Sequence, residues 1–305
     1  MSEINLSVKL GALTLPNPIL TASGTFGYAK EVASLYDLSR LGGIIPKTIT
    51  LEPRPGNKPP RTVEVVAGLL NAIGLDNDGV DEFLTQKLPW LRSTGAPIIV
   101  SFAAKRIDEC EIFARKFAAA EGIAALEMNI SCPNVSDGVD FGTDPILCEK
   151  IVARMKAHCR LPLCVKLSPN VTSIADMARA AEAGGADMIS AINTLYGLAV
   201  DWRRRIPRIA NGYAGYSGPA VKPVALRCVS QIFRAVEIPV IGIGGVESAQ
   251  DVMEFFVAGA AAVAVGTANF YCPDAPIRIL EELPVLLAEA SVTSPSELVG
   301  TLKFS

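Results

Sequence analysis

The chain has 305 residues, half of them apolar and 19% charged, and its net charge at pH 7 is −3. This length suits two ordinary domains or one large barrel, and the apolar fraction can fill a sizeable core. The small net charge argues against a nucleic-acid-binding surface, because the only basic cluster is the short run DWRRRIPR at 201–208.

The sequence also argues against secretion, membrane insertion and metal binding. The first residues lack the basic segment and apolar stretch of a secretory signal, and no apolar run reaches the roughly 18 residues of a membrane span. The cysteines form no C-x-x-C pair, so we expect no zinc or iron–sulfur site built by this chain alone. We therefore expect a cytoplasmic protein whose thiols are reduced and mostly buried.

Short β-branched runs alternate with longer amphipathic segments along the chain. The first residues, INLSVKLGALTLPNP, alternate like a small hairpin. Eight strands are then expected, at 18–23, 43–50, 97–103, 125–131, 161–168, 186–194, 238–245 and 261–267. Several are continuous apolar runs, which is typical of parallel strands covered on both faces. Helices are expected between them, for example at 108–122, 173–185 and 248–260.

This alternation predicts a (β/α)₈ TIM barrel that occupies residues 1–305 as a single domain, with the N-terminal hairpin closing its bottom. Two long loops rich in Pro, Gly and Asn, at 51–78 and 195–219, are expected as insertions at the C-terminal face of the strands. A doubly wound open sheet is the alternative. It would need a nucleotide-binding fingerprint near the first strand, and TASGTFG at 21–27 does not match G-x-G-x-x-G.

Polar residues stand where the expected strands end, which is where TIM barrels carry their chemistry. They are Ser23, Lys47, Thr48, Ser101, Asn129, Lys166, Asn193 and Thr194. Two lysines set in apolar runs at one mouth favour a functional role over a surface role. The last two strands end in Gly244-Gly245 and Gly266-Thr267, where backbone N–H groups can approach an anion. These turns predict a bound phosphate group on a cofactor or substrate.

Cys132 is the candidate base at this mouth. The single histidine, His158, lies near the end of an expected helix, where a solvated or capping role is more usual. Glu127 shares the strand face of Asn129, and we expect it to be the structural partner of a buried lysine. Cys132 has neither His nor a second Cys nearby in the sequence for metal ligation, and neighbouring lysines would favour its thiolate.

Several motifs together resemble those of dihydroorotate dehydrogenases. They are SGTFGY (23–28), PKTITLEPRPGNKPPR (46–61), GLLNAIGLDNDGV (68–80), NISCPNV (129–135), VKLSPN (165–170), NTLYG (193–197), GYSGPAVKPVALR (215–227), IGIGG (241–245) and VGT (265–267). The resemblance runs from the first strand to the last. NAIGL, YSGPA and the thiol at position 132 resemble the NAD-linked class 1B catalytic subunits. The resemblance implies oxidation of dihydroorotate to orotate in de novo pyrimidine biosynthesis.

The resemblance also implies an FMN cofactor in the barrel mouth, with its phosphate on the turns Gly244–Gly245 and Gly266–Thr267. The other positions that match flavin contacts are Ser23, Lys47, Thr48, Ser101, Asn129, Lys166, Ile192 and Gly218. Positions that match pyrimidine contacts are Lys47, Asn71, Ala72, Ile73, Gly74, Leu75, Asn129, Asn193 and Thr194. Cys132 matches the base that removes the C5 proton of dihydroorotate.

The sequence departs from the family pattern at three places. Ser101 stands where the family has Asn near the flavin, and Asp76 and Asp78 stand where Gln and Pro are more frequent. The loop at 135–142 is a residue shorter than usual, which bears on how Cys132 is covered.

Electron transfer beyond the flavin is expected to need a second protein. The chain has neither a dinucleotide-binding fingerprint nor a cysteine cluster. The resemblance implies a partner subunit that carries FAD and a [2Fe–2S] cluster and passes electrons to NAD⁺, in a heterotetramer of two catalytic and two partner chains.

Three alternatives stay open at this point. Two are related enzymes, a fumarate-dependent class 1A dihydroorotate dehydrogenase and a dihydropyrimidine dehydrogenase-like reductase. The third is a phosphate-binding barrel without redox chemistry, such as an isomerase or an aldolase that uses Lys166 to form a Schiff base.

Overall fold

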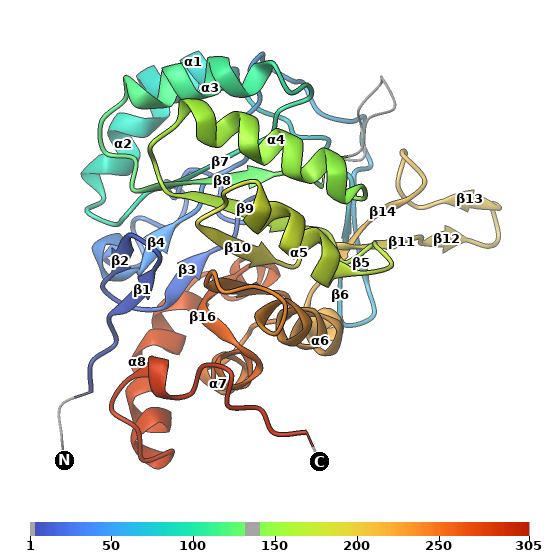
Figure 1. The fold of residues 1–305 in the computed structure, drawn as a ribbon. Coiled ribbons are helices and arrows are strands. Elements are labelled where there is room, and N and C mark those ends of the chain that lie inside the picture. Colours follow the sequence, from blue (N-terminus) through green and yellow to red (C-terminus); the bar gives the residue numbers. More distant parts are fainter. Residues whose placement is uncertain (1–3, 132–140, 305) are drawn as a thin grey trace.

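The computed structural model describes residues 4–131 and 141–304, which form a barrel of parallel strands surrounded by helices (Figure 1). The strands are hydrogen-bonded in the order β4-β3-β16-β15-β10-β9-β8-β7. Their bounds are β3 (Ile19–Thr21), β4 (Gly43–Ile44), β7 (Ile99–Phe102), β8 (Ala125–Asn129), β9 (Leu163–Leu167), β10 (Met188–Ala191), β15 (Val240–Ile243) and β16 (Ala260–Val265). Parallel bridges from Ile44 to Ile98 and from Ile49 to Phe102 join the two ends of this order. The predicted TIM barrel is therefore confirmed.

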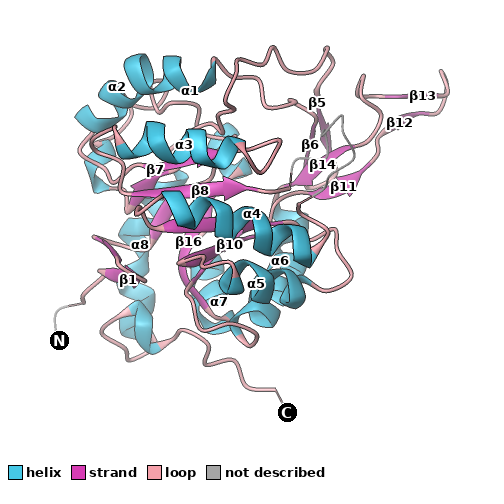
Figure 2. Ribbon diagram, turned by 45° about the horizontal axis from the view of Figure 1, so that its top comes forward, coloured by secondary structure: helices cyan, strands magenta, loops and turns pink. Residues whose placement is uncertain are grey.

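Helices cover the outer face of the barrel, as Figure 2 shows. They are α3 (Glu109–Ala118), α4 (Pro145–His158), α5 (Ile174–Ala183), α6 (Lys222–Phe233), α7 (Ala249–Ala258) and α8 (Ala275–Glu289). A further helical segment lies between β4 and β7 in the chain and consists of α1 (Gly79–Glu82), the π-helical turn η2 (Phe83–Lys87) and α2 (Leu88–Ser93). Side chains of Asp144, Ser173 and Ser248 cap the first N–H groups of α4, α5 and α7.

The connection after β3 differs from the expected strand–helix unit. Between β3 and β4 the chain forms turns and one short 3₁₀ segment, η1 (Leu38–Arg40), instead of an α-helix. Gly27 and Ala29 have φ angles of 50° and 63°. Because this left-handed backbone cannot continue a right-handed helix, the chain turns early here.

The N-terminal hairpin closes one end of the barrel, as predicted. It consists of the antiparallel strands β1 (Val8–Leu10) and β2 (Leu13–Leu15). Leu10 and Leu15 are fully buried and belong to the same apolar cluster as Ile99 and Ile241 of the barrel strands. The hairpin thus fills one end of the barrel and leaves the carboxyl ends of the strands for a site.

The two inserted loops meet in a second sheet that sequence patterns did not predict. Its antiparallel strands are β5 (Thr62–Val65), β6 (Gly68–Asn71), β11 (Leu195–Gly197) and β14 (Ala214–Ser217), in the order β11-β14-β6-β5. A small hairpin, β12 (Val200–Asp201) and β13 (Ile206–Pro207), projects beyond it (Figure 1). None of the helices in the described ranges has the length and apolarity that a bilayer span requires.

Candidate active site

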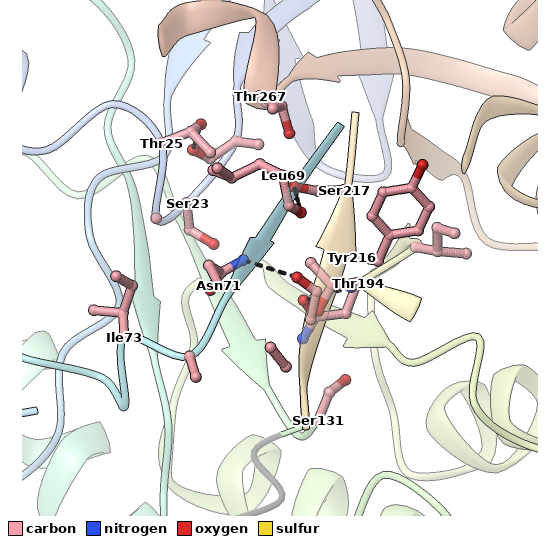
Figure 3. Close-up of a pocket in the computed structure, with 18 of the residues that line it drawn as sticks. Ser23, Thr25, Leu69, Asn71, Ile73, Ser131, Thr194, Tyr216, Ser217 and Thr267 are labelled. Carbon is pink, nitrogen blue, oxygen red and sulfur yellow. Dashed lines mark hydrogen bonds between the residues drawn. The ribbon is translucent and has the colours of Figure 1, made fainter. Parts of the chain in front are cut away.

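A cavity of about 730 Å³ lies at the carboxyl ends of the barrel strands and is bordered by β6, β11 and β14 of the second sheet (Figure 3). This volume falls within the roughly 300–1,000 Å³ of small-molecule and cofactor sites. Its described lining includes Lys47 and Lys166 but neither Asp nor Glu. The cavity therefore suits a ligand that carries negative charge.

Lys166 is a buried cation at the wall of this cavity. It lies on β9, is 4% exposed, and its Nζ donates a hydrogen bond to Ser23 Oγ at 3.1 Å. Glu127 Oε1, on the neighbouring strand β8, lies 3.9 Å from the same Nζ. The predicted pairing of Glu127 with a buried lysine is thus confirmed.

Three asparagine side chains line the cavity from different strand ends. Asn129 ends β8, and its Oδ1 accepts from Asn193 Nδ2 at 3.5 Å and from the N–H of Ser131 at 3.2 Å. Asn71 ends β6 and donates to the carbonyl of Gly215 at 3.4 Å (Figure 3). These amides can donate to and accept from a planar ligand with ring carbonyl and N–H groups.

Asn170 also lines the cavity, although sequence reasoning gave it no role. Its Nδ2 donates to the carbonyl of Thr194 at 2.9 Å and to Ser168 Oγ at 3.1 Å, and its Oδ1 accepts from the N–H of Tyr196. The side chain thereby fixes the turn that presents Thr194 to the cavity. The available signal was its place in VKLSPN, directly after β9.

The loop 71–75 is held in place by a second buried amide that was not predicted. Asn77 is 6% exposed, and its Nδ2 donates to the carbonyl of Leu75 at 2.7 Å and to Thr50 Oγ1 at 2.8 Å. Its Oδ1 accepts from the N–H groups of Thr50 and Gly79. Leu75 has a φ of 55°, a left-handed backbone conformation that a non-glycine residue rarely adopts. The hydrogen bonds of Asn77 therefore stabilise a backbone conformation that is unfavourable by itself.

The turn after β15 has the backbone form that an anion site needs. Gly245 has a φ of 74°, and a Cβ there would lie 2.7 Å from the Cβ of Lys222, so a larger residue does not fit. Asp251 accepts from the N–H groups of Glu247 and Ser248 and from Lys222 Nζ. Burial opposes ionisation of Asp251, but these hydrogen bonds hold its pKa below the usual value.

The turn after β16 leaves room beside its backbone. A Cβ on Gly266 would meet only the Cβ of Ala22, at 3.7 Å, and the residue borders the cavity together with Thr267. The two glycine turns and the room beside Gly266 fit a bound phosphate group.

The structure brings nearly all the predicted binding residues to this one cavity. Its lining includes Ser23, Lys47, Thr48, Asn71, Ala72, Ile73, Gly74, Leu75, Asn129, Lys166, Ile192, Asn193, Thr194, Gly218, Gly244, Gly245, Gly266 and Thr267. Ser101 is not among the described lining residues. It is fully buried and lies 2.8 Å from Thr48 Oγ1, behind the cavity wall. Cys132 lies outside the described residues; Ser131, the residue before it, lines the cavity.

Five of the six thiols in the described residues have the properties of core residues, and the sixth, Cys272, is only partly buried. Burial raises the pKa of Cys110 and Cys148 to about 12, and it raises the pKa of Cys159, Cys164 and Cys228 as well. At neutral pH such thiols stay protonated and unreactive. His158 ends α4 and is 4.0 Å from Glu111, away from the described cavity lining.

Comparison with known proteins agrees with this site. The family model described as dihydroorotate dehydrogenase matches residues 5–287. A protein of Trichlorobacter lovleyi named "Dihydroorotate dehydrogenase B (NAD(+)), catalytic subunit" is 50% identical over 299 residues, which cover 98% of each chain. Proteins with the same name are 51% identical in Solidesulfovibrio magneticus, over 99% of each chain, and 49% identical in Bacillus pumilus, over 97% of this chain and 96% of the relative.

Proposed function

The chain belongs to the dihydroorotate dehydrogenase family, and we propose that it is the cytoplasmic catalytic subunit of the NAD⁺-linked enzyme. It would oxidise dihydroorotate to orotate in pyrimidine biosynthesis. The observation that carries this proposal is the single cavity that collects two lysines, six asparagines and two glycine turns, with no carboxylate in its described lining. The relatives' shared name favours this branch over a fumarate-dependent, dihydropyrimidine dehydrogenase-like or non-redox barrel.

We propose that FMN is the cofactor of this chain. When bound, it would supply the hydride acceptor, its N5 atom. The backbone N–H groups of Gly244–Gly245 and Gly266–Thr267 would hold its phosphate. Ser23, Thr48 and Lys166 would contact the isoalloxazine ring, with Ile192 and Gly218 as further contacts. Ser101 would act on the flavin only through Thr48, because it lies behind that side chain.

The substrate would lie against the amide groups and Lys47. Dihydroorotate carries a carboxylate and two ring carbonyls, and Asn71, Asn129 and Asn193 supply N–H donors at the cavity wall. These groups are held by neighbouring bonds before the substrate arrives, so little reorganisation is needed as charge develops on the ring. The loop 71–75, fixed by Asn77, would close one side of the pyrimidine site.

We propose Cys132 as the general base that removes the C5 proton of dihydroorotate. The described cavity lining offers no His, Asp, Glu or Cys that could take this role instead. Ser131, directly before Cys132 in the chain, donates from its Oγ to the carbonyl of Lys166 at 3.3 Å. This bond joins the residue directly before Cys132 to β9, the strand that carries Lys166.

Electrons would leave through a partner subunit that carries FAD and a [2Fe–2S] cluster, in an assembly of two catalytic and two partner chains. The term "catalytic subunit" in the relatives' name supports a separate partner.

The visible spectrum of the purified chain tests the proposed function. We expect flavin absorption that dihydroorotate bleaches under anaerobic conditions. Reoxidation should be fast with an artificial dye and slow with fumarate or with NAD⁺ alone. A colourless protein would contradict the flavin, rapid turnover with fumarate would indicate the other class, and reduction of uracil without any response to dihydroorotate would indicate the reductase.

A further inference from the structure

A fully buried carboxylate lies next to the cavity but outside its described lining. Glu127 has no exposed surface, and its Oε2 accepts a hydrogen bond from Ser190 Oγ at 3.0 Å. Its other oxygen, Oε1, is buried without a hydrogen-bond partner in the described part of the chain. A buried carboxylate oxygen without a hydrogen bond raises the free energy of the folded state, so a specific role of Glu127 is expected.

Among the residues that the structure describes, Lys166 carries the charge paired with Oε1. The two atoms are 3.9 Å apart, beyond hydrogen-bonding distance, while Lys166 Nζ donates to Ser23 at the cavity wall. Side-chain exposure is 5% for Lys166 and zero for Glu127, so water screens this pair very little. The ammonium therefore lies between a buried negative charge and the cavity.

We propose that Glu127 is a positioning residue that holds Lys166 at the cavity wall, partly offsets its charge, and so sets the reduction potential of FMN bound there. This inference rests on the proposed function. Reduction adds negative charge to the flavin ring, and nearby cations stabilise the reduced form. The carboxylate of Glu127 opposes this stabilisation, which keeps the potential lower than Lys166 alone would make it. A lower potential favours onward transfer of the electrons to NAD⁺.

The barrel supplies a matched control beside Glu127. In the register of β8 and β9, Glu127 lies opposite Cys164, which is also buried and carries no charge. Cys164→Ala removes packing at the same level of the barrel and keeps the charges of Glu127 and Lys166. A shift in potential that arises from loosened packing would therefore occur in this variant too.

The test compares the midpoint potential of bound FMN in the wild type, Glu127→Gln, Glu127→Asp and Cys164→Ala, by spectroelectrochemical titration. Glu127→Gln keeps the size of the side chain and removes its charge. We expect the equilibrium constant for two-electron reduction to rise about tenfold, which corresponds to about 30 mV. Glu127→Asp keeps the charge but moves it one methylene away from Lys166, so the rise should be smaller. Cys164→Ala should leave the potential unchanged.

Each outcome has a separate meaning. A wild-type chain that binds no FMN contradicts the proposed function itself. A wild type that binds and reduces FMN, with an unchanged potential in Glu127→Gln, overturns the role of Glu127 and leaves the function standing. If Glu127→Gln does not fold, an unchanged midpoint potential in Glu127→Asp overturns the proposed role of Glu127. An equal shift in Cys164→Ala would also overturn it, because packing would then explain the effect.

Discussion

Asn77→Ala tests whether one buried amide holds the loop 71–75 in the form that the proposed substrate needs. The side chain takes part in hydrogen bonds with Thr50, Leu75 and Gly79. The Thr50 hydroxyl keeps a bond to the carbonyl of Glu52. Two backbone N–H groups and the Leu75 carbonyl therefore lose their partner.

The expected magnitude follows from these three groups. Each lost bond costs about 1 kcal/mol net, so the free energy of unfolding should fall by about 3 kcal/mol. This is a large part of the roughly 5–15 kcal/mol that stabilises a typical protein. Because the loop rather than the glycine turns is loosened, the dissociation constant of orotate should rise about tenfold while that of FMN stays within about twofold.

Urea denaturation followed by circular dichroism measures the first quantity, and titrations followed by flavin absorbance and fluorescence measure the second. Asn5→Ala is the control, because its side chain is exposed and accepts a single bond from the N–H of Ser7. The control should stay within about 0.5 kcal/mol of the wild type. An Asn77→Ala loss below about 1 kcal/mol, or equal weakening of orotate and FMN binding, would refute the reasoning.

Three further substitutions test other parts of the site. Cys132→Ala should slow flavin reduction by dihydroorotate at least about 100-fold while FMN stays bound, and a near-normal stopped-flow rate would exclude Cys132 as the base. Asp251→Asn should weaken FMN about tenfold in fluorescence titrations but leave riboflavin, which lacks the phosphate, unchanged; equal effects would argue against a phosphate turn. The native pKa of Asp251 is lowered, so this carboxylate stabilises the fold above its unfolded pKa. The stabilisation is lost as the pH falls through the native pKa. Melting temperatures of the variant and the wild type should therefore converge in acid. Ser101→Ala should cost about 1 kcal/mol in urea denaturation and change FMN affinity less than about threefold; loss of FMN would indicate direct contact with the flavin.

The sequence predicted the fold because burial leaves a local pattern. Runs such as IPVIGIGG and AAVAVGT are apolar on both faces, and the structure has β15 and β16 at these places. Strand β15 is four residues shorter than predicted, and β16 is one residue shorter. Parallel strands that end at one edge of a sheet bring their last residues together. The predicted strand ends were therefore enough to place Lys166, Asn129 and Asn193 at the cavity.

The tertiary structure decided which polar groups meet across long sequence distances. Strand β6 pairs with β14 although Asn71 and Gly215 lie far apart in the chain, and no local pattern encodes that register. The support of the 71–75 loop by Asn77 and the separation of Ser101 from the cavity are contacts of the same kind. Periodicity records which face of an element is buried, whereas the partner of a buried polar group depends on how the closed barrel and its inserted loops pack. The sequence alone therefore determined the barrel and the residues at its mouth, and only the folded chain decided how those residues are held.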